Sequence, residues 1–283
     1  KLDECEQVLC IASTKKEAEK IFELLDGEAM YLSTNLCPAH RREIIREMKT
    51  RLRDGKPCRV VSTSIISVGV DIDFPVVYLQ YTGLDSLIQG AGRCNREGRQ
   101  SLQKSRAHIF WTKESKKSLF MRKEKQVTDM VRKKYNAEEM TEPSAIRTYF
   151  ENWYQSNEGN LDYREIEKLA QSLSFAEIGK RFHLINDSTK SVFIPFDEKA
   201  RNIKEQLMMG NRSRQLMRAA GAYMINVRYS KAQGQSDFMK LLTQGQIEMF
   251  PGDENLAYLL NMEDYDAELG LKIKSEDGVG IMW

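Results

Sequence analysis

What this chain of 283 residues lacks excludes several classes of protein. It has no GxxxxGK[ST] loop and no Asp-Glu pair of the magnesium-binding type at the end of an expected strand, so it lacks the phosphate cradle and metal site of nucleotide-hydrolysing proteins. It also has no apolar run of the roughly 18 residues that a membrane helix needs, and no signal-peptide pattern. We therefore expect a cytoplasmic protein without membrane contacts.

Cysteine is scarce as well. The five cysteines are odd in number and form no CxxC pair, which favours reduced, mostly buried thiols over a disulfide framework or a zinc site. They are Cys5, Cys10, Cys37, Cys58 and Cys94. We expect no metal site in this chain.

A large excess of charge of one sign is also missing. The 43 Lys and Arg residues nearly balance the 41 Asp and Glu residues, so the net charge of +2 does not mark the whole chain as a nucleic-acid binder. Any basic surface must be local. Between Lys113 and Lys134, nine basic residues stand against three acidic ones. A solvated helix face and a phosphate-contacting helix explain this excess about equally well.

Short apolar runs alternate with helical patterns over the first third of the chain. The expected strands are Val8–Ala12, Ala29–Leu32, Arg59–Thr63, Val76–Tyr81 and Ala107–Trp111. The expected helices are Lys15–Leu25, Pro38–Arg53 and one that Asp85 caps and that reaches about Arg93. Because strand and helix alternate, the pattern predicts an α/β fold with a parallel sheet covered by helices on both faces.

The pattern changes after position 112. The expected helices are one that begins near Lys113 and carries Leu119, Phe120, Val127, Met130 and Val131, then Ile146–Tyr154 and Tyr163–Phe182. A small α+β unit follows, with the expected elements Val192–Phe196, Lys199–Met208, Tyr223–Tyr229, Ile247–Phe250 and Leu256–Leu260. We therefore expect three parts, 1–112, 113–195 and 196–283. Because the chain opens on Lys1 and soon enters a strand, we expect a piece of a longer protein.

Four aromatic residues lie close together in the middle of the chain. They are Tyr149, Phe150, Trp153 and Tyr154. Aromatic rings can stack on the bases of a single strand. Spaced as one helical stripe, these four rings more simply indicate a helix that buries itself against its neighbours.

Two linked signals that bear on chemistry follow the strand Arg59–Thr63. In the first, hydroxyl residues at the strand end, Thr63 and Ser64 among them, precede Gly69 and Asp71. Ligands of parallel sheets collect beyond the carboxyl ends of strands, where hydroxyl and amide groups can hold phosphates. Gly69 would permit close backbone approach, and the Asp71 carboxylate could accept a hydrogen bond from a ribose hydroxyl.

The second signal is the run Gln89-Gly-Ala-Gly-Arg93-Cys-Asn-Arg96. If the helix continues through it, Gln89, Arg93 and Arg96 share one face. Arginines suit a transferring phosphoryl group, because the guanidinium is always charged and presents a planar fork of donors. A solvated basic face is the usual explanation of three such residues alone. Their position after the strand and the Gly-Val-Asp turn favours the phosphate interpretation.

This ordered set resembles motifs IV, V and VI of superfamily 2 helicases. Within that superfamily, three stretches resemble the signature helicase-nuclease of type I CRISPR systems: LSTNLCPAHRREII from Leu32, VSTSIISVGVDIDFP from Val61 and LIQGAGRCNREGR from Leu87. The stretch YDAELGL at Tyr265 is a weaker match. The resemblance implies that 1–112 is the second RecA-like lobe, that 113–195 is a helical extension, and that 196–283 is a C-terminal α+β domain.

The resemblance also implies a cofactor, ATP with Mg²⁺, held mainly by a first lobe outside this sequence. Arg93 and Arg96 would be arginine fingers that reach the γ-phosphate and stabilise charge in the transition state. The nucleotide side of the cleft would be completed by Gly69, Asp71 and Gln89. The single-strand backbone would be gripped by hydroxyl residues that follow strands, namely Ser13, Thr14, Ser33, Thr34, Thr63 and Ser64. For each of these six, an ordinary helix cap or turn is nearly as good an explanation.

The family function implied is ATP-dependent 3′ to 5′ translocation on single-stranded DNA. Implied partners are the first lobe, a nuclease domain, single-stranded DNA and an RNA-guided surveillance complex; an inhibitor protein is a further candidate without an identifying residue pattern. The three histidines His40, His108 and His183 are too scattered to indicate the family's two-metal nuclease. The alternative left open is a non-catalytic docking module or a separate subunit that binds the surveillance complex or DNA.

Overall fold

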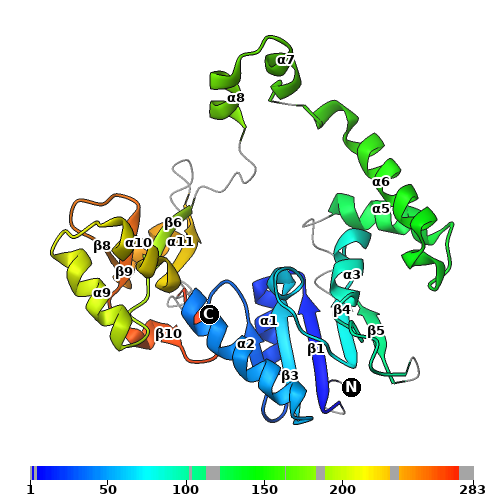
Figure 1. The fold of residues 1–283 in the computed structure, drawn as a ribbon, viewed down its shortest axis with the longest axis horizontal. Helices are drawn as coiled ribbons and strands as arrows, with labels where there is room; N and C mark the ends of the chain where they lie inside the picture. The colour runs from blue at the N-terminus through cyan, green and yellow to red at the C-terminus, as the bar shows by residue number, and fades with distance from the viewer. Residues whose placement is uncertain are drawn as a thin grey trace, which may run out of the picture. The chain divides into compact units, whose positions relative to one another are not determined.

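The computed structural model describes residue 2 and residues 5–101, 104–112, 122–162, 164–182, 189–229 and 236–273. The chain divides into two compact units. One comprises Lys1–Ile66 and Asp187–Trp283, and the other comprises Ser67–Asn186. Figure 1 shows the elements of both. No helix within the described ranges has the length and apolar character that crossing a membrane requires.

A parallel sheet of five strands confirms the α/β class that the alternating pattern predicted. Its strands are β1 (Gln7–Ala12), β2 (Met30–Leu32), β3 (Cys58–Thr63), β4 (Val76–Gln80) and β5 (Arg106–Phe110), in the order β2-β3-β1-β4-β5. The pairs β1–β3, β2–β3 and β4–β5 are parallel. Every residue of β1 after Gln7 is buried, as expected of a strand covered on both faces.

Helices α1 (Lys15–Glu23), α2 (Pro38–Arg53) and α3 (Leu84–Ala91) follow β1, β2 and β4, and the 3₁₀ turn η1 (Ser64–Ile66) follows β3. Pro38 begins α2, because its fixed φ suits a helix and its missing N–H has no partner in the first turn. The expected cap at Asp85 is wrong. Gly83 caps α3 without a side-chain bond, and the Asp85 carboxylate accepts the Tyr149 hydroxyl at 2.8 Å instead.

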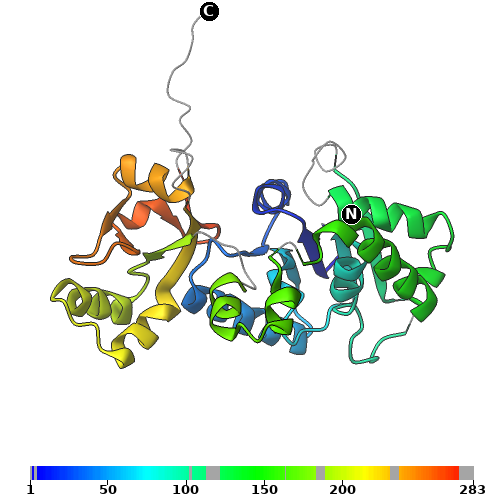
Figure 2. The ribbon, with the colours of Figure 1, turned by 90° about the horizontal axis from the view of Figure 1, so that it is seen from above.

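The unit Ser67–Asn186 also contains α5 (Arg122–Arg132), η2 (Glu139–Thr141) and α6 (Pro143–Asn157); α5 and α6 lie side by side in Figures 1 and 2. One buried cluster joins α3, α5 and α6; its members are Leu84, Val127, Val131, Ala145 and Tyr149. Met130, expected on the buried face of α5, is exposed. Leu119 and Phe120, expected on the same helix, lie outside the described residues.

The aromatic stripe on α6 is only half buried. Tyr149 lies in the cluster and Trp153 packs against it, whereas Phe150 and Tyr154 are exposed. Residues four apart lie on one line of a helix, but neighbouring residues differ by about 100° in direction. A narrow contact with α5 can therefore bury Tyr149 and Trp153 and leave the adjacent Phe150 and Tyr154 exposed.

The single helix expected over Tyr163–Phe182 is wrong, because the structure has two short helices, α7 (Ile166–Gln171) and α8 (Phe175–Arg181), after the turn η3 (Glu158–Asn160). Leu173 lies between them with a φ of 54°, a left-handed conformation that ends a right-handed helix. Tyr163 itself lies outside the described residues.

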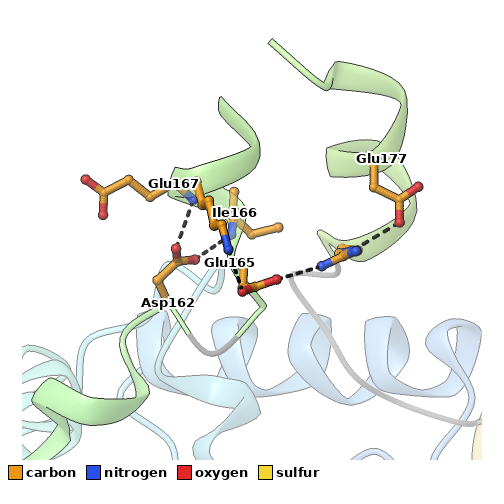
Figure 3. A network of polar contacts seen from close by, with 7 residues as sticks. Asp162, Glu165, Ile166, Glu167 and Glu177 are labelled. Carbon is orange, nitrogen blue, oxygen red and sulfur yellow. Dashed lines mark hydrogen bonds and ion pairs between the residues drawn. The ribbon is translucent and has the colours of Figure 1, made fainter. Parts of the chain in front are cut away.

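Polar contacts hold α7 and α8 together, as Figure 3 shows. The Asp162 carboxylate accepts the amides of Ile166 and Glu167 at 2.6 and 3.0 Å, which satisfies the first turn of α7. Arg181 of α8 forms ion pairs with Glu165 at 3.3 Å and with Glu177 at 3.0 Å. Exposed ion pairs contribute little stability each, so this helix pair has only weak internal support.

A second sheet of four strands forms the C-terminal part of the other unit. Its strands are β6 (Thr189–Phe193), β7 (Met224–Arg228), β8 (Ile247–Met249) and β9 (Leu256–Leu259), in the order β7-β6-β9-β8. Its helices are α9 (Glu198–Met208), α10 (Arg214–Ala220) and α11 (Asp237–Thr243), with the turn η4 (Gly221–Tyr223) between α10 and β7. In Figure 2, α9 and α10 lie on one side of this sheet and α11 on the other. The sequence pattern did not predict α10 or α11, whose seven residues each are too few for a clear helical period.

A short hairpin ends the described chain. After the turn η5 (Met262–Asp264), its strands β10 (Tyr265–Asp266) and β11 (Gly270–Leu271) pair antiparallel. The core of the four-stranded sheet also takes in Cys37 and Ala39 from the start of α2. Strand β6 begins at Thr189, inside the range 113–195 that was expected as the helical extension. The expected boundary at 195/196 itself stays a prediction.

Candidate nucleotide and nucleic-acid site

Arg93 and Arg96 do not lie on a helix with Gln89, and that expectation is wrong. Helix α3 ends at Ala91, and the chain then runs beside Phe74, just ahead of β4. The Phe74 amide donates to the Arg93 carbonyl, and the Asn95 amide donates to the Phe74 carbonyl, both at 2.9 Å. This strand-like pairing takes the backbone out of the helix. The two glycines that flank Ala91 also make the helix easy to end.

The Arg93 guanidinium is buried, with 7% of the residue exposed. One of its terminal nitrogens, Nη2, donates to the Ser67 carbonyl. Its Nε and Nη1 atoms are also buried, and they have no hydrogen-bond partner among the described residues. Burial lowers the pKa of Arg93, and the nearby Arg96 lowers it further, while Asp71 raises it. A buried cation with two unused donors is costly, and an anion at this place would satisfy both donors.

Arg96 is exposed and lies on the turn after Arg93. Its Nε atom is 3.5 Å from the Asp71 carboxylate. Its amide donates to the Asp73 carboxylate at 2.7 Å. Asn95 between the two arginines has a φ of 48°, and its side chain bonds the backbone of Gln100 at 2.8 and 2.9 Å. Two carboxylates and one left-handed residue therefore hold the turn that carries Arg96.

The other three residues expected around the nucleotide are exposed. Asp71 pairs with Arg96, so in this structure its carboxylate serves an arginine rather than a ribose. Gly69 has a φ of 75°, which favours glycine, and a Cβ atom there would meet no other atom within 4 Å. Gln89 faces solvent on α3. The structure thus gathers Asp71, Arg93 and Arg96, and Gly69 lies in the turn that carries Asp71. Gln89 lies on α3, four residues before Arg93.

The six hydroxyl residues expected to bind a nucleic-acid backbone lie at or just after the ends of β1, β2 and β3. These strands are parallel neighbours, and in their register Ala12 faces Thr63 and Leu32 faces Ser62. Their carboxyl ends therefore share one edge of the sheet, and so do the residues at or just after these ends: Ser13, Thr14, Ser33, Thr34, Thr63 and Ser64.

Several of these hydroxyls have local structural tasks. The Thr14 hydroxyl accepts the Glu17 amide at 3.2 Å and caps α1. The buried Ser33 hydroxyl accepts the Asn35 amide at 3.1 Å. Thr63 is buried, and Ser13 is partly exposed. Thr34 and Ser64 are exposed, and they are the two hydroxyl residues best able to reach a ligand.

Two residues beside these loops, Lys15 and Asn35, were not expected from the sequence pattern. Lys15 Nζ donates to the Asn35 side chain at 2.6 Å, and the Asn35 amide group donates to Glu19 at 3.1 Å. The signal was available, since Asn35 directly follows Ser33 and Thr34 and Lys15 directly follows Thr14. Lys15 adds a cation to an edge of hydroxyl and amide groups that Glu17 and Glu19 also border.

An Asp-Glu pair that does follow a strand was also overlooked. Asp197 and Glu198 follow β6, but the Asp197 carboxylate accepts the Ala200 amide at 2.7 Å and caps α9. Its other oxygen accepts the Tyr223 hydroxyl at 2.9 Å. The carboxylate is therefore committed to the fold. Within the described ranges, no three His, Cys, Asp or Glu side chains form a group that could hold a metal ion.

One of the three scattered histidines, His108, is partly buried. His108 lies on the edge strand β5 and stacks on Tyr78 with ring centroids 4.8 Å apart. His183 lies outside the described residues. Apart from the arginine turn, the same unit has an apolar pocket of about 370 Å³ between β4, β5, α3 and α5, lined by Leu79, Leu87 and Ile109 among others. No expected site residue lines it.

Comparisons with known proteins agree on one family. A family model described as CRISPR-associated nuclease/helicase Cas3, C-terminal, matches residues 4–99. The CRISPR-associated nuclease/helicase Cas3 of Methanothermobacter thermautotrophicus is 27% identical over 185 residues, which are 58% of this chain and 22% of that protein. This chain therefore spans about a fifth of the length of that relative.

Solved structures share the fold at low sequence identity. T. fusca Cas3-AMPPNP aligns with a TM-score of 0.53 and 15% identity over 89% of this chain and 35% of that chain. A chain of a CRISPR RNA-guided surveillance complex, pre-nicking, aligns with a TM-score of 0.56 and 13% identity over 93% of this chain and 40% of that chain. The family match covers every expected site residue from Ser13 to Arg96. The chain is thus similar to a C-terminal portion of Cas3 helicase-nucleases, most directly over residues 4–99.

Proposed function

We propose that this chain is the second RecA-like lobe and C-terminal domain of an ATP-dependent 3′ to 5′ translocase on single-stranded DNA. Its part in turnover is to supply two arginine fingers and contacts to the DNA backbone. The phosphates and Mg²⁺ are held mainly by a first lobe outside this sequence, because the 283 residues contain no phosphate loop.

The observation that carries this proposal is the Arg93 guanidinium. It is buried, two of its donors have no hydrogen-bond partner among the described residues, and the nearby charge of Arg96 lowers its pKa. A pure docking surface has no need of a buried cation without an anion, since such a group destabilises the fold. A γ-phosphate would satisfy both donors, and the planar fork of the guanidinium matches phosphate oxygens.

The two arginines have different parts in the proposed reaction. Arg93 is rigid, because burial and the Ser67 carbonyl hold it, so it provides a preorganised charge. The ion pair of Arg96 is easily exchanged, because its partner Asp71 is exposed and the Arg96 Nε atom lies 3.5 Å from the Asp71 carboxylate. We propose that Arg96 leaves Asp71 for the phosphate when the first lobe closes. ATP supplies the transferable γ-phosphoryl group, and Mg²⁺ on the first lobe neutralises its oxygens.

The DNA backbone is proposed to cross the edge formed by the carboxyl ends of β1, β2 and β3. Thr34 and Ser64 are exposed there, and Lys15 lies beside the loop that carries Thr34. Contacts of this kind are to phosphate and sugar, so they are independent of base sequence. A translocase that acts on any sequence needs such contacts.

The proposed partners follow from the relatives. One structural neighbour is a chain in a CRISPR RNA-guided surveillance complex, and the relatives are called nuclease/helicase. We propose that the complete protein carries a nuclease domain and is recruited by a surveillance complex of that kind. The chain would then draw the recruited DNA strand toward the nuclease.

An ATPase measurement tests the finger assignment. The chain is combined with a helicase lobe that carries a phosphate loop, and ATP hydrolysis is measured with and without single-stranded DNA. We expect Arg93→Ala and Arg96→Ala each to lower kcat by about 10³-fold or more, since arginine fingers contribute about 10³ to 10⁵. The expected loss is in kcat rather than KM, because the charge is needed in the transition state.

Arg99→Ala is the matched control. Arg99 lies in the same segment, is mostly exposed and pairs with Glu97, so we expect near-normal turnover and the same melting temperature as the wild type. If both finger variants hydrolyse ATP as fast as the Arg99→Ala control, the arginines are not fingers. The docking-module alternative would then stand.

A further inference from the structure

The β10–β11 hairpin reaches back to the loop that follows β2. The Leu271 amide donates to the Asn35 carbonyl at 2.9 Å. These residues are more than two hundred positions apart in the sequence but belong to the same compact unit. The hairpin thus makes a backbone bond to the neighbour of Thr34, one of the two exposed hydroxyl residues at the proposed DNA edge.

Gly270 allows this close approach. Its φ is 82°, and a Cβ atom there would lie 2.3 Å from the Asn35 carbonyl oxygen and 2.9 Å from the Leu36 amide nitrogen. Those atoms are backbone, so they cannot rotate away as a side chain would. Any other residue at this position would push the loop or displace the hairpin.

Tyr265 makes a second contact with the same loop. Its hydroxyl oxygen accepts the Cys37 amide at 3.1 Å and lies 3.0 Å from Nδ1 of His40 on α2. Phe196 stacks on the His40 ring with centroids 4.6 Å apart, and it also contacts the Tyr265 ring edge-on with centroids 6.0 Å apart. The hairpin therefore holds the loop at Asn35 and at Cys37, two residues apart.

The hairpin is itself tied to the C-terminal sheet. The side chain of the buried Gln246, next to β8, donates to the Lys272 carbonyl at 3.0 Å, and the Lys272 amide donates to the Asp264 carbonyl at 2.9 Å. From the other direction, Lys15 and Glu19 of α1 hold the Asn35 side chain. The loop is thus clamped between α1 and the C-terminal hairpin.

We propose that the β10–β11 hairpin sets the conformation of loop 33–37 for binding to the DNA backbone, with Gly270 and Tyr265 as positioning residues. The inference rests on the proposed function, since it assumes that Thr34 contacts nucleic acid. A loop that is already ordered binds without an ordering cost, whereas a loop released from its clamp must be ordered by the ligand. The C-terminal domain then acts on DNA binding through the loop, without touching the DNA itself.

A pair of glycine variants tests the inference in the chain combined with its first-lobe partner. Gly270→Ala strains the backbone and forces Cβ against Asn35. Gly210→Ala imposes the same backbone strain at a φ of 83°, in the same C-terminal domain, where no atom lies within 4 Å of the added Cβ. Binding of a fluorescein-labelled oligothymidylate is measured by anisotropy. We expect Gly270→Ala to weaken binding on the order of tenfold, the scale of ordering a few loop residues, and Gly210→Ala to leave it unchanged.

A double-mutant cycle separates positioning from general damage. Thr34→Ala removes the proposed contact, so Gly270→Ala should weaken binding much less in the Thr34→Ala background than in the wild type. Equal effects in both backgrounds, or equal binding by the two glycine variants, would overturn the inference. If the wild type itself fails to bind the oligonucleotide, the proposed function fails instead.

Tyr265→Phe keeps the test decisive if Gly270→Ala does not fold. It removes only the hydroxyl that accepts the Cys37 amide, and the ring remains to pack against His40 and Phe196. We expect a several-fold loss of oligonucleotide binding by a folded variant. Binding equal to the wild type would contradict the inference.

Discussion

At the scale of single residues, His40 shows how a side chain without an assigned role acquires one through packing. It is buried in contact with Phe196 and Tyr265, with its ring 22° from the plane of the Phe196 ring. Burial lowers the pKa of His40 below its ordinary value, and the nearby Glu43 offsets part of this effect. The folded protein therefore prefers a neutral imidazole at this position.

The lowered pKa of His40 predicts a loss of stability in mild acid. An unfolded histidine titrates near about 6.5, whereas the folded one takes its proton only at lower pH. Below about pH 6.5 the unfolded state therefore binds more protons, and the free energy of unfolding falls as the pH falls. Above that pH both states are neutral, and His40 adds no pH dependence.

Urea unfolding measures this loss of stability at about pH 7.5 and about pH 5.5, two values on either side of the ordinary histidine pKa. We expect the wild type to lose more stability between the two values than His40→Asn, which cannot take up a proton. The compared quantity is the change in the free energy of unfolding between the two pH values within each protein. A destabilisation that is the same at both pH values therefore cancels. Equal losses would mean that His40 is not held neutral by the fold.

At the scale of secondary-structure elements, the start of α9 depends on one carboxylate. Asp197 caps the helix through Ala200 and also accepts the hydroxyl of the buried Tyr223 in η4. Burial, together with the bond to Asp197, raises the pKa of Tyr223 to about 12. One side chain thus joins α9 to the residues that lead into β7.

Asp197→Ala should destabilise the C-terminal domain by about 2 to 4 kcal/mol. Loss of a helix cap costs about 1 kcal/mol, and a buried hydroxyl left without a partner costs about 1 to 3 kcal/mol more. Ser213→Ala is the matched control. The Ser213 side chain caps α10 through the Leu216 amide, but it does not also accept a buried tyrosine hydroxyl as Asp197 does. Urea unfolding gives both values, and a cost for Asp197→Ala no larger than that for Ser213→Ala would contradict the two-partner role.

Element boundaries show where local patterns fail. The strands and α1 and α2 begin and end within a few residues of their expected positions, because apolar periods and caps are local signals. Helix α3 stops early, because its following residues pair with Phe74, some twenty positions upstream. Helices α7 and α8 separate at Leu173, a residue with no helix-breaking tendency of its own.

At the scale of the whole molecule, the near balance of charge limits how the chain can bind DNA. The net charge is +2, and the residues at the proposed DNA edge are mostly neutral hydroxyl groups. Lys15 is the cation found beside the loop that carries Thr34. Strong attraction by the overall field is therefore not expected, and binding should depend on a few short contacts.

This balance predicts a weak salt dependence of binding to single-stranded DNA. Each phosphate neutralised on a single strand contributes about −0.7 to the slope of log K against log salt, so one lysine predicts a slope of about −0.7. Anisotropy titrations at several salt concentrations measure it. A much steeper slope, reduced by Lys133→Ala and Lys134→Ala, would show instead that the basic segment around α5 contacts the DNA.

The sequence by itself determined the α/β class, the order of most strands and helices, the family resemblance and the residues that stand at strand ends. These features are encoded locally, in apolar spacing, in helix caps and in short motifs such as GVD and QGAGRCNR. Even the placement of the hydroxyl residues along one edge followed from the strand pattern, because parallel strands end on the same side of a sheet.

Tertiary structure alone decided which of those residues are free to act. It buried Arg93 with unused donors while it paired Arg96 with Asp71, and it assigned Thr14 and Ser33 to caps and turns. It also brought Gly270 against Asn35 and Tyr265 against His40. These contacts join residues that are distant along the chain, and they depend on burial and shape, which no local pattern specifies.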